Sequence, residues 1–296
     1  MAINTVTVSS ATNWVHAVWA SELSDASQAW TGLSDLVDRQ YEDEMSIGDV
    51  IEIPDAANPA VRFKSADVAG TYSNVTETNQ NVTINLQAYV AFLVEDIAEL
   101  QSQYAVRSTY TSKATYSLMS TVEGDATSGL ASAPDNFSQL VGSLGVEPTT
   151  DNMIRAVQYL DDGDVPEGDR FFYMSPSTHA SLLKQDVFVS GDYGPSGAVG
   201  SGRISKPVYG ATTHVSSLAN NNPSTAAQSY SWFCHKKGVA LIMQRKPQIH
   251  TVYDLLNFGW GVGVDCIYNF VERLILPSTL ASTTPDDRFN VGIRGA

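Results

Sequence analysis

Apolar and polar residues alternate in the segment that precedes residue 90, and this alternation predicts β-strands. A first apolar run over residues 50–53 ends at Pro54, and residues 60–63 form a second short run. Farther along, residues 82–86 alternate strictly, as in a strand with one buried face. The polar stretch 66–80 holds too few apolar residues for a core meander. The pattern therefore predicts a hairpin that projects from the body of the protein.

Apolar residues at spacings of three and four predict helices in three places. The longest extends over residues 93–123 and is expected to end at Gly124. Its Ser and Thr residues lower the helix propensity, so a break near the middle stays open. A shorter helix is expected over residues 150–160, capped by Thr149 or Thr150, and a weak one over residues 23–37. The apolar positions are Leu93, Ile97, Leu100, Tyr104, Ala114, Leu118, Met119 and Val122 in the first helix and Met153, Ile154, Val157 and Leu160 in the second.

The remaining sequence mixes one further helix with short strands. Residues 171–174 are a compact apolar strand, and Ser175 followed by Pro176 is typical of a helix start. A glycine-rich loop over residues 190–206 follows. Five strands are then expected at residues 231–233, 239–243, 249–255, 259–264 and 267–276. A hairpin, a long helix, a mixed middle and final strands together predict an α+β fold.

The composition of the chain excludes several classes of protein. The chain has 296 residues, of which 43% are hydrophobic and 17% charged, so a sizeable core is expected. The chain has 17 basic and 32 acidic residues, which gives a net charge of −15. This charge argues against a protein that wraps nucleic acid by neutralising its phosphates. Two cysteines cannot build a disulfide framework. The apolar runs are too short to span a membrane. No basic residue precedes Arg39, so the positive region of a secretory signal is missing, and we expect a soluble protein made inside the cell.

Acidic residues are concentrated near the N-terminus. Residues 1–61 contain ten of them, opposed only by Arg39, so this arm carries −9 of the net charge. Two interpretations stay open. The arm is a solvated, self-repelling face, or it pairs with the basic pairs 236–237 and 245–246 on neighbouring copies.

No group of residues has the pattern of an active site. The loop 191–202 is glycine-rich but lacks the Lys and Ser or Thr of a phosphate-binding loop, so a surface loop is expected. The acidic residues in 161–169 lack EF-hand spacing and are expected to form a turn that ends a helix. Cys234 and His235 are adjacent and would point to opposite faces of a strand. We therefore predict no catalytic residue, no cofactor site, no metal site and no enzymatic activity.

The order of these segments resembles a known family. It is carried by residues 48–54, 82–86 and 94–101, then by 156–160 with 164–176, and finally by 208–218 and 238–244. These stretches resemble, in order and spacing, the major capsid proteins of tailed bacteriophages with the Hong Kong 97-type fold. The likeness extends from about residue 45 to residue 276.

The resemblance implies a division of the chain. Residues 1–45 would form an N-terminal arm and 46–86 an extended β-hairpin loop that lies over a neighbouring subunit. Residues 87–130 and 249–275 would form the peripheral domain with its long spine helix. Residues 131–248 would form a mixed α/β axial domain, with the loop 191–202 near the five-fold and six-fold centres, and 276–296 a C-terminal segment.

The resemblance also implies a function and partners. The protein would be a structural subunit that self-assembles into hexamers and pentamers of an icosahedral shell. That shell would enclose packaged double-stranded DNA, in a virion assembled in the host cytoplasm. A separate scaffolding protein and a portal are expected, a decoration protein stays open, and no membrane is involved. Covalent cross-linking through Lys64, the lysine of the loop region, is not expected.

Two other functions stay open. An encapsulin-like nanocompartment shell shares the fold and encloses cargo enzymes. A β-rich carbohydrate-binding or adhesin module would suit the five Trp and 13 Tyr residues, although aromatic residues at this density are ordinary core residues.

Overall fold

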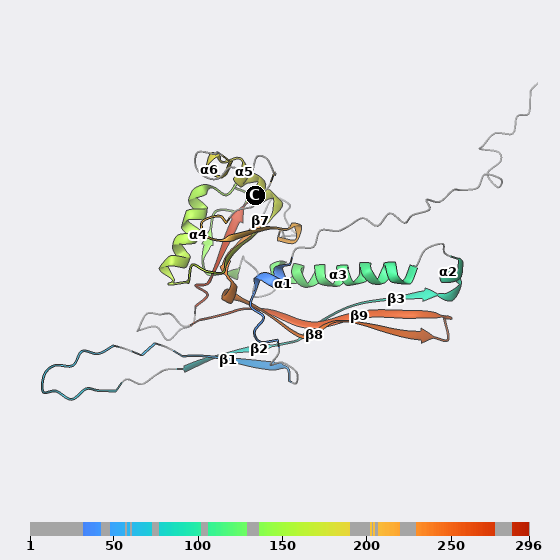
Figure 1. Cartoon of the computed structure of the whole chain (residues 1–296), viewed down its shortest axis with the longest axis horizontal. Helices are drawn as coiled ribbons and strands as arrows, with labels where there is room; N and C mark the ends of the chain where they lie inside the picture. Colours follow the sequence, from blue (N-terminus) through green and yellow to red (C-terminus); the bar gives the residue numbers. More distant parts are fainter. Residues whose placement is uncertain are drawn as a thin grey trace, which may run out of the picture.

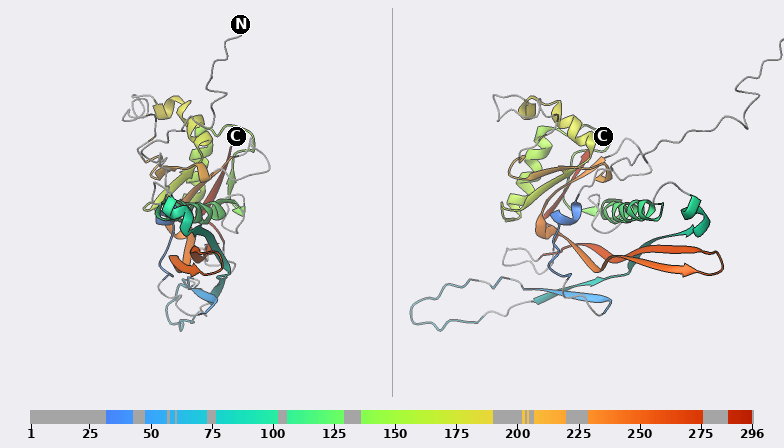
Figure 2. Two further views of the ribbon diagram at one scale, coloured as in Figure 1. Left: turned by 90° about the vertical axis from the view of Figure 1, so that its right-hand side faces the viewer. Right: turned by 45° about the vertical axis from the view of Figure 1, so that its right-hand side comes forward.

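The computed structural model describes residues 32–42, 48–56, 58–59, 61–72, 77–101, 106–128, 136–189, 202, 204, 207–219, 229–275 and 286–295. This part of the chain is elongated, with a hairpin projecting at one end and a narrow three-stranded sheet at the other (Figures 1 and 2). Its elements are α1 (Leu33–Leu36), β1 (Val50–Ala56), β2 (Glu77–Thr83), β3 (Leu86–Glu95), α2 (Asp96–Gln101), α3 (Val106–Ser128), β4 (Leu140–Val141), α4 (Thr150–Asp162), β5 (Arg170–Met174), α5 (Pro176–Leu183), α6 (Asp186–Val189), β6 (Thr212–Val215), η2 (Ser217–Ala219), β7 (Ser229–His235), η3 (Lys236–Gly238), β8 (Val239–Asp254), β9 (Gly259–Glu272) and β10 (Asn290–Gly295).

A five-stranded mixed sheet has the order β4-β10-β7-β5-β6. The strand β7 is antiparallel to both of its neighbours, whereas β4 pairs parallel with β10 and β6 parallel with β5. Every residue of β5 and β7 is buried, because apolar clusters cover both faces. Phe171 and Trp232 belong to the cluster that includes α3, and Phe172 and Phe233 belong to the cluster that includes α4. Such strands have continuous apolar sequences rather than alternating ones.

The three-stranded sheet places β9 between β3 and β8, antiparallel to both. Helix α3 lies along one face of this sheet (Figure 1). Leu118 and Val122 of the helix belong to the same core cluster as Val264 and Tyr268 of β9. The opposite face packs against the β1–β2 hairpin near Ile242 and Ile267 and is exposed toward the far end, where Leu93 and Val252 lie.

The hairpin of β1 and β2 is antiparallel, with Val50 opposite Thr83 and Ala56 opposite Glu77. Ile51, Ile53 and Val82 are buried in a small cluster with Ile242 of β8, and this cluster fixes the base of the hairpin to the body. The described residues between the strands, 58–59 and 61–72, extend away from the body (Figure 1), so the projecting hairpin is confirmed.

The strand and helix bounds expected for the first half need correction. β1 continues through Pro54, which is tolerated because a two-stranded ribbon leaves the proline nitrogen on an edge. The strand expected at 60–63 is wrong, since residues 61–65 have no regular structure and are exposed. The helix expected over 93–123 is also wrong in its first part, because β3 continues to Glu95 and α2 and α3 are separate helices. α3 does not end at Gly124 but continues to Ser128.

The second half contains longer strands than expected. The strands expected at 239–243 and 249–255 are one strand, β8, with register shifts near Arg245 and Gln248. These irregularities accommodate Pro247 within the strand. The strands expected at 259–264 and 267–276 are likewise one strand, β9, which ends at Glu272. The short strands β4 and β6 and the final strand β10 were not expected.

Three elements of the middle segment are confirmed: α4, β5 and α5. Within α4, Met153, Ala156 and Leu160 are buried, but Ile154 is half exposed, so its assignment to the buried face is wrong. Of the helix expected over 23–37, the described part contains only the turn α1. Most of the loop 190–206 lies outside the described residues. No helix in the described part is long and apolar enough to cross a membrane.

The first turn of α5 offers a test of helix capping. The Oγ atom of Ser175 accepts a hydrogen bond from the backbone N–H of Thr178, and Ser175 is fully buried. Ser175→Ala should therefore lower the free energy of unfolding by about 1 kcal/mol, measured by denaturant titration followed by circular dichroism. Thr149→Ala is the matched control, since the Thr149 side chain makes no capping bond to α4. An equal effect of both substitutions would contradict the assignment.

Candidate assembly surfaces

The acidic turn over residues 161–169 ends α4, as expected. Arg170 is buried, and its Nη2 atom donates to Oδ1 of Asp161 at 2.7 Å and to the carbonyl of Val165. Among the described residues, no three His, Cys, Asp or Glu side chains are grouped so that they could hold a metal ion. This cluster therefore closes a turn through an ion pair.

Cys234 and His235 both lie in the fully buried strand β7. Burial raises the pKa of the Cys234 thiol far above its ordinary value, so this thiol stays protonated. Nδ1 of His235 accepts a hydrogen bond from the backbone of Lys237, and burial lowers the pKa of this histidine. Both side chains have packing and hydrogen-bonding roles inside the fold.

Part of the acidic N-terminal segment pairs within its own chain. The Glu42 carboxylate binds Arg39 and lies 3.6 Å from Nζ of Lys246. Asp38 lies 3.6 Å from Arg273. The basic pair 245–246 thus has a partner within the subunit. Residues 1–31 lie outside the described part, so the pairing of the arm with neighbouring copies stays a prediction.

The open face of the three-stranded sheet carries a regular pattern of side chains. Its rows run across β3, β9 and β8 in that order. Successive rows are Glu95–Gly259–Asp254, Leu93–Gly261–Val252, Ala91–Gly263–His250 and Tyr89–Asp265–Gln248. The two middle rows have glycine at the centre and larger residues at the sides. The centre of the face is therefore lower than its two walls.

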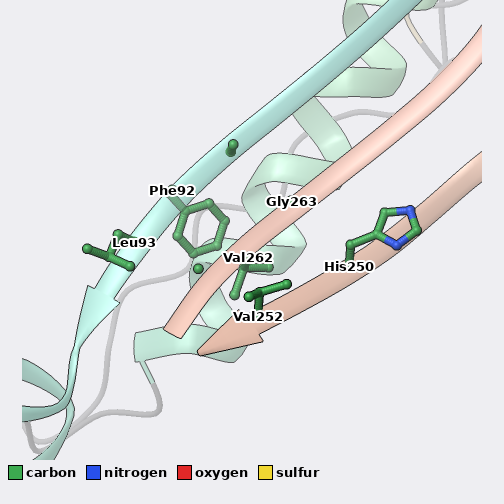
Figure 3. Close-up of a pocket in the computed structure, with 8 residues that line it drawn as sticks. Phe92, Leu93, His250, Val252, Val262 and Gly263 are labelled. Carbon is green, nitrogen blue, oxygen red and sulfur yellow. The ribbon is translucent and has the colours of Figure 1, made fainter. Parts of the chain in front are cut away.

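This hollow has a volume of about 480 Å³. Its lining includes Ala91 and Leu93 on β3, His250 and Val252 on β8, and Gly261 and Gly263 on β9 between them. We call these six residues the trough. Figure 3 shows Leu93, Gly263, His250 and Val252 on the three strands. Its exposed walls are mainly apolar, since Val252 is 69% exposed and Leu93 42% exposed. An apolar depression with hydrocarbon walls in contact with water is typical of a binding surface.

A polar cluster limits the trough on the side nearer to the body. Asp265 accepts hydrogen bonds from Arg245 at 3.0 Å and from Gln87 at 3.2 Å, and its Oδ1 lies 3.0 Å from Nε2 of His250. Desolvation acts to raise the pKa of this carboxyl, but the bonds from Arg245 and Gln87 outweigh it and lower the pKa below its ordinary value. Asp265 therefore stays charged and holds the surrounding side chains in place.

The far end of the sheet has an apolar tip. Leu256 is 90% exposed and Phe258 is 68% exposed in the turn between β8 and β9. The Asp254 carboxylate accepts bonds from the backbone of Leu256 and the side chain of Asn257, which lowers its pKa and fixes the turn. Tyr253 donates to Asp96 of α2. The subunit therefore holds apolar side chains in contact with water at its tip.

The opposite end of the molecule also exposes apolar side chains. The hairpin loop, residues 61–72, joins β1 to β2 and projects from the body (Figure 1). Phe63 is 98% exposed, and Val61 is 74% exposed. Exposed apolar side chains grouped in this way are candidates for an interaction surface.

The sequence interpretation identified neither the trough nor the tip. The signal was present in residues 259–264, which read Gly-Trp-Gly-Val-Gly-Val. Glycine at every second position of a strand predicts a face without side chains.

Of the comparisons with known proteins, only the one with solved structures finds proteins similar to this chain. No protein-family model matches the sequence, and a search of the curated proteins finds no match. Solved structures match over almost the whole chain. A chain of the capsid structure of the cyanophage P-SCSP1u is similar with a TM-score of 0.76 at 16% identity, covering 100% of this chain and 97% of that chain.

Two further structures agree. A chain of the acidic stable capsid structure of Helicobacter pylori bacteriophage KHP30 has a TM-score of 0.71 at 12% identity, covering 99% of this chain and 100% of that chain. A chain of Mycobacterium phage Che8 has a TM-score of 0.69 at 20% identity, covering 95% and 97%. At such identities the likeness is one of fold: this protein has the fold of bacteriophage capsid chains.

Proposed function

We propose that this protein is the major capsid subunit of a tailed bacteriophage. Copies of it would self-assemble into the hexamers and pentamers of an icosahedral shell around packaged double-stranded DNA. The observation that carries this proposal is the similarity to chains of phage capsid structures from one end of the chain to the other. Exposed apolar side chains at both ends of the subunit support it, because assembly would bury them.

The fold is proposed to be of the Hong Kong 97 type, with the division given by the resemblance. Residues 1–45 are the N-terminal arm, 46–86 the extended loop, 87–130 and 249–275 the peripheral domain, 131–248 the axial domain and 276–296 the C-terminal segment. In this scheme α3 is the spine helix. The strand β8 crosses the boundary between residues 248 and 249, and β10 pairs with β7 in the five-stranded sheet. The peripheral and axial domains would therefore be joined by the continuous strand β8, and the C-terminal segment would complete the sheet of the axial domain.

The proposed role is structural and not enzymatic. The protein's net charge of −15 suits a shell that encloses DNA without binding its phosphates tightly. Partners would be other copies of the chain, a separate scaffolding protein, a portal and, in some shells, a decoration protein. The protein would be assembled in the host cytoplasm and reside in the virion, without a cofactor, a metal ion or a membrane.

The test is assembly of the purified chain, alone and co-expressed with its neighbouring genes. We expect rings of five and six copies, or closed shells, in negative-stain microscopy and matching fast-sedimenting species in analytical ultracentrifugation. A chain that stays monomeric or dimeric under all of these conditions would contradict the proposal. Treatment of any shells with nuclease is the control, because assembly that does not depend on DNA should survive it.

The other two functions predict different results. An encapsulin-like shell would copurify with a cargo enzyme and would lack terminase and portal genes beside its own gene. A carbohydrate-binding module would remain small and bind glycans. Neither has support from the chains to which this protein is similar.

A further inference from the structure

Two connections between the five-stranded and the three-stranded sheet come into contact. The first leads from β7 through η3 to β8, and the second leads from β9 to β10. A Cβ atom on Gly238, in the first connection, would clash with Oδ1 of Asn290, which begins β10. The carbonyl of Gly238 accepts hydrogen bonds from the backbone of Arg273 and from the side chain of Asn290, both at 2.9 Å. A change in the angle between the two sheets therefore disturbs these contacts.

Two carboxyl groups lie at this contact. Oε1 of Glu272 accepts a hydrogen bond from the Asn290 side chain at 3.1 Å. The Asp287 carboxyl lies within hydrogen-bonding reach of Glu272. It also accepts from the backbone N–H and the hydroxyl of Ser138, which precedes β4. The carboxyl pair thus joins the end of β9 to β10, to the start of β8 and to the segment before β4. We call Ser138, Gly238, Glu272, Asp287 and Asn290 the latch.

The latch has more hydrogen-bond acceptors than donors. Its acceptors are both carboxylates, the carbonyl of Gly238 and Oδ1 of Asn290, whereas its donors are the Asn290 amide, Ser138 and the backbone of Arg273. Oδ1 of Asn290 is buried and has no hydrogen-bond partner among the described residues. Two adjacent carboxylates that are shielded from water also repel each other. One proton on the carboxyl pair supplies a further donor and removes the repulsion.

The positive charges near the latch are paired with other carboxylates. Arg273 lies 3.6 Å from Asp38. Arg288 lies 3.7 Å from Asp286. Both arginines therefore have partners outside the latch and leave its carboxyl pair to be neutralised by a proton.

The other titratable neighbours are neutral. Burial raises the pKa of the Cys234 thiol and lowers the pKa of the His235 ring, so neither side chain is charged at neutral pH. Burial, together with the Asp287 carboxyl, raises the pKa of Glu272 to about 8, although the hydrogen bond from Asn290 opposes this shift. The surroundings thus favour the protonated pair at neutral pH.

We propose that the latch is a proton-dependent lock between the two sheets, closed while Glu272 and Asp287 hold one proton and opened when that proton is released to water. The two states differ in proton affinity, so a change of pH shifts the balance between them. Opening would let the β8–β9 hairpin, which extends from the latch to the far end of the molecule (Figure 1), change its angle to the five-stranded sheet. This inference goes beyond the proposed function, because it concerns the shape of a single copy.

Hydrogen exchange of the full-length chain, measured by mass spectrometry at pH 6 and pH 9, tests the lock. The parent chain and Glu272→Gln are compared at the same pH, so that the intrinsic exchange rate cancels. At pH 9 the peptides that contain the latch should exchange faster in the parent chain, by a ratio at least tenfold larger than the ratio for peptides of α4. At pH 6 both ratios should be close to one, because the carboxyl pair is protonated and glutamine is always neutral.

Asp286→Asn is the matched control, since it removes a carboxylate from the same segment but outside the latch. This variant should behave as the parent chain does, and circular dichroism checks that each protein is folded. Equal exchange of the latch peptides in the parent chain and Glu272→Gln at pH 9 would overturn the proposal. A difference of the same size in every peptide would overturn it too, because Glu272 would then act only on global unfolding. Neither result depends on the formation of shells, so a failure of the proposed function is a separate outcome.

Discussion

Replacing Trp232 by alanine should lower the free energy of unfolding by about 3–5 kcal/mol. Trp232 is fully buried in β7, the central strand of the five-stranded sheet. Its ring centroid lies 6.1 Å from those of Phe137 and Tyr173 and 6.5 Å from that of Phe171. Alanine would leave a cavity among these rings, and strands on both sides of β7 limit how far the surroundings can collapse.

Two substitutions provide the comparison. The indole Nε1 of Trp232 has no hydrogen-bond partner among the described residues, so Trp232→Phe loses volume but no hydrogen bond and should cost less than half as much. Trp260→Ala removes a half-buried ring that contacts Tyr253 near the tip of the three-stranded sheet, and it should also cost less. Guanidinium unfolding followed by circular dichroism measures all three. A Trp232→Ala variant within 1 kcal/mol of the parent chain would contradict this account of the core.

Local sequence patterns correctly predicted the elements whose caps and apolar positions match the surroundings they have in the fold. In α5, Ser175 and Pro176 specify a helix start by local hydrogen bonding and backbone geometry, so no knowledge of the rest of the fold was needed. In α4, a single apolar stripe faces a single core cluster. The prediction failed over residues 93–95, which belong to β3, a strand with apolar residues on both faces. Leu93 matches the helical spacing of Ile97 and Leu100 by coincidence, since it lies in β3 and they lie in α2.

The other errors in the predicted strands arise because strands pair with partners that lie far away in the sequence. β10 is a strand because its backbone completes the sheet beside β7, and nothing local to residues 290–295 shows that partner. The strands expected at 239–243 and 249–255 lie on either side of Pro247, whereas bulges carry β8 past it. The assembly surfaces were missed for a related reason. The trough forms only where β3, β9 and β8 lie side by side, and no local pattern shows that arrangement.

The second large effect concerns a partly buried carboxyl at the end of β9. Oε1 of Glu272 accepts a hydrogen bond from the Asn290 side chain at 3.1 Å. Desolvation and the nearby Asp287 carboxyl raise the pKa of Glu272 to about 8, although the Asn290 bond opposes them. Asn290 is fully buried and also donates to the carbonyl of Gly238. Glu272 thus titrates where β9 and β10 meet the start of β8.

The raised pKa of Glu272 determines whether its contribution to stability rises or falls with pH. In the unfolded chain Glu272 loses its proton near pH 4.5, so between pH 4.5 and about 8 the folded state holds a proton that the unfolded state has released. The contribution of Glu272 to stability must therefore fall as the pH rises through this window. The contribution is complete below pH 4.5 and lost above about pH 8. For a partly buried group we expect a total of about 2–4 kcal/mol.

Glu272→Gln should remove that slope. Glutamine stays neutral, and its oxygen can still accept from Asn290 while its amide can donate to Asp287. The variant should match the parent chain near pH 4 and be more stable by about 2–4 kcal/mol at pH 9, measured by urea unfolding at each pH. Glu52→Gln, at an exposed position of β1, is the control that should leave the slope unchanged. If the parent and Glu272→Gln curves run parallel from pH 4 to pH 9, Glu272 is not the group that titrates, and the junction between the two sheets does not loosen at high pH.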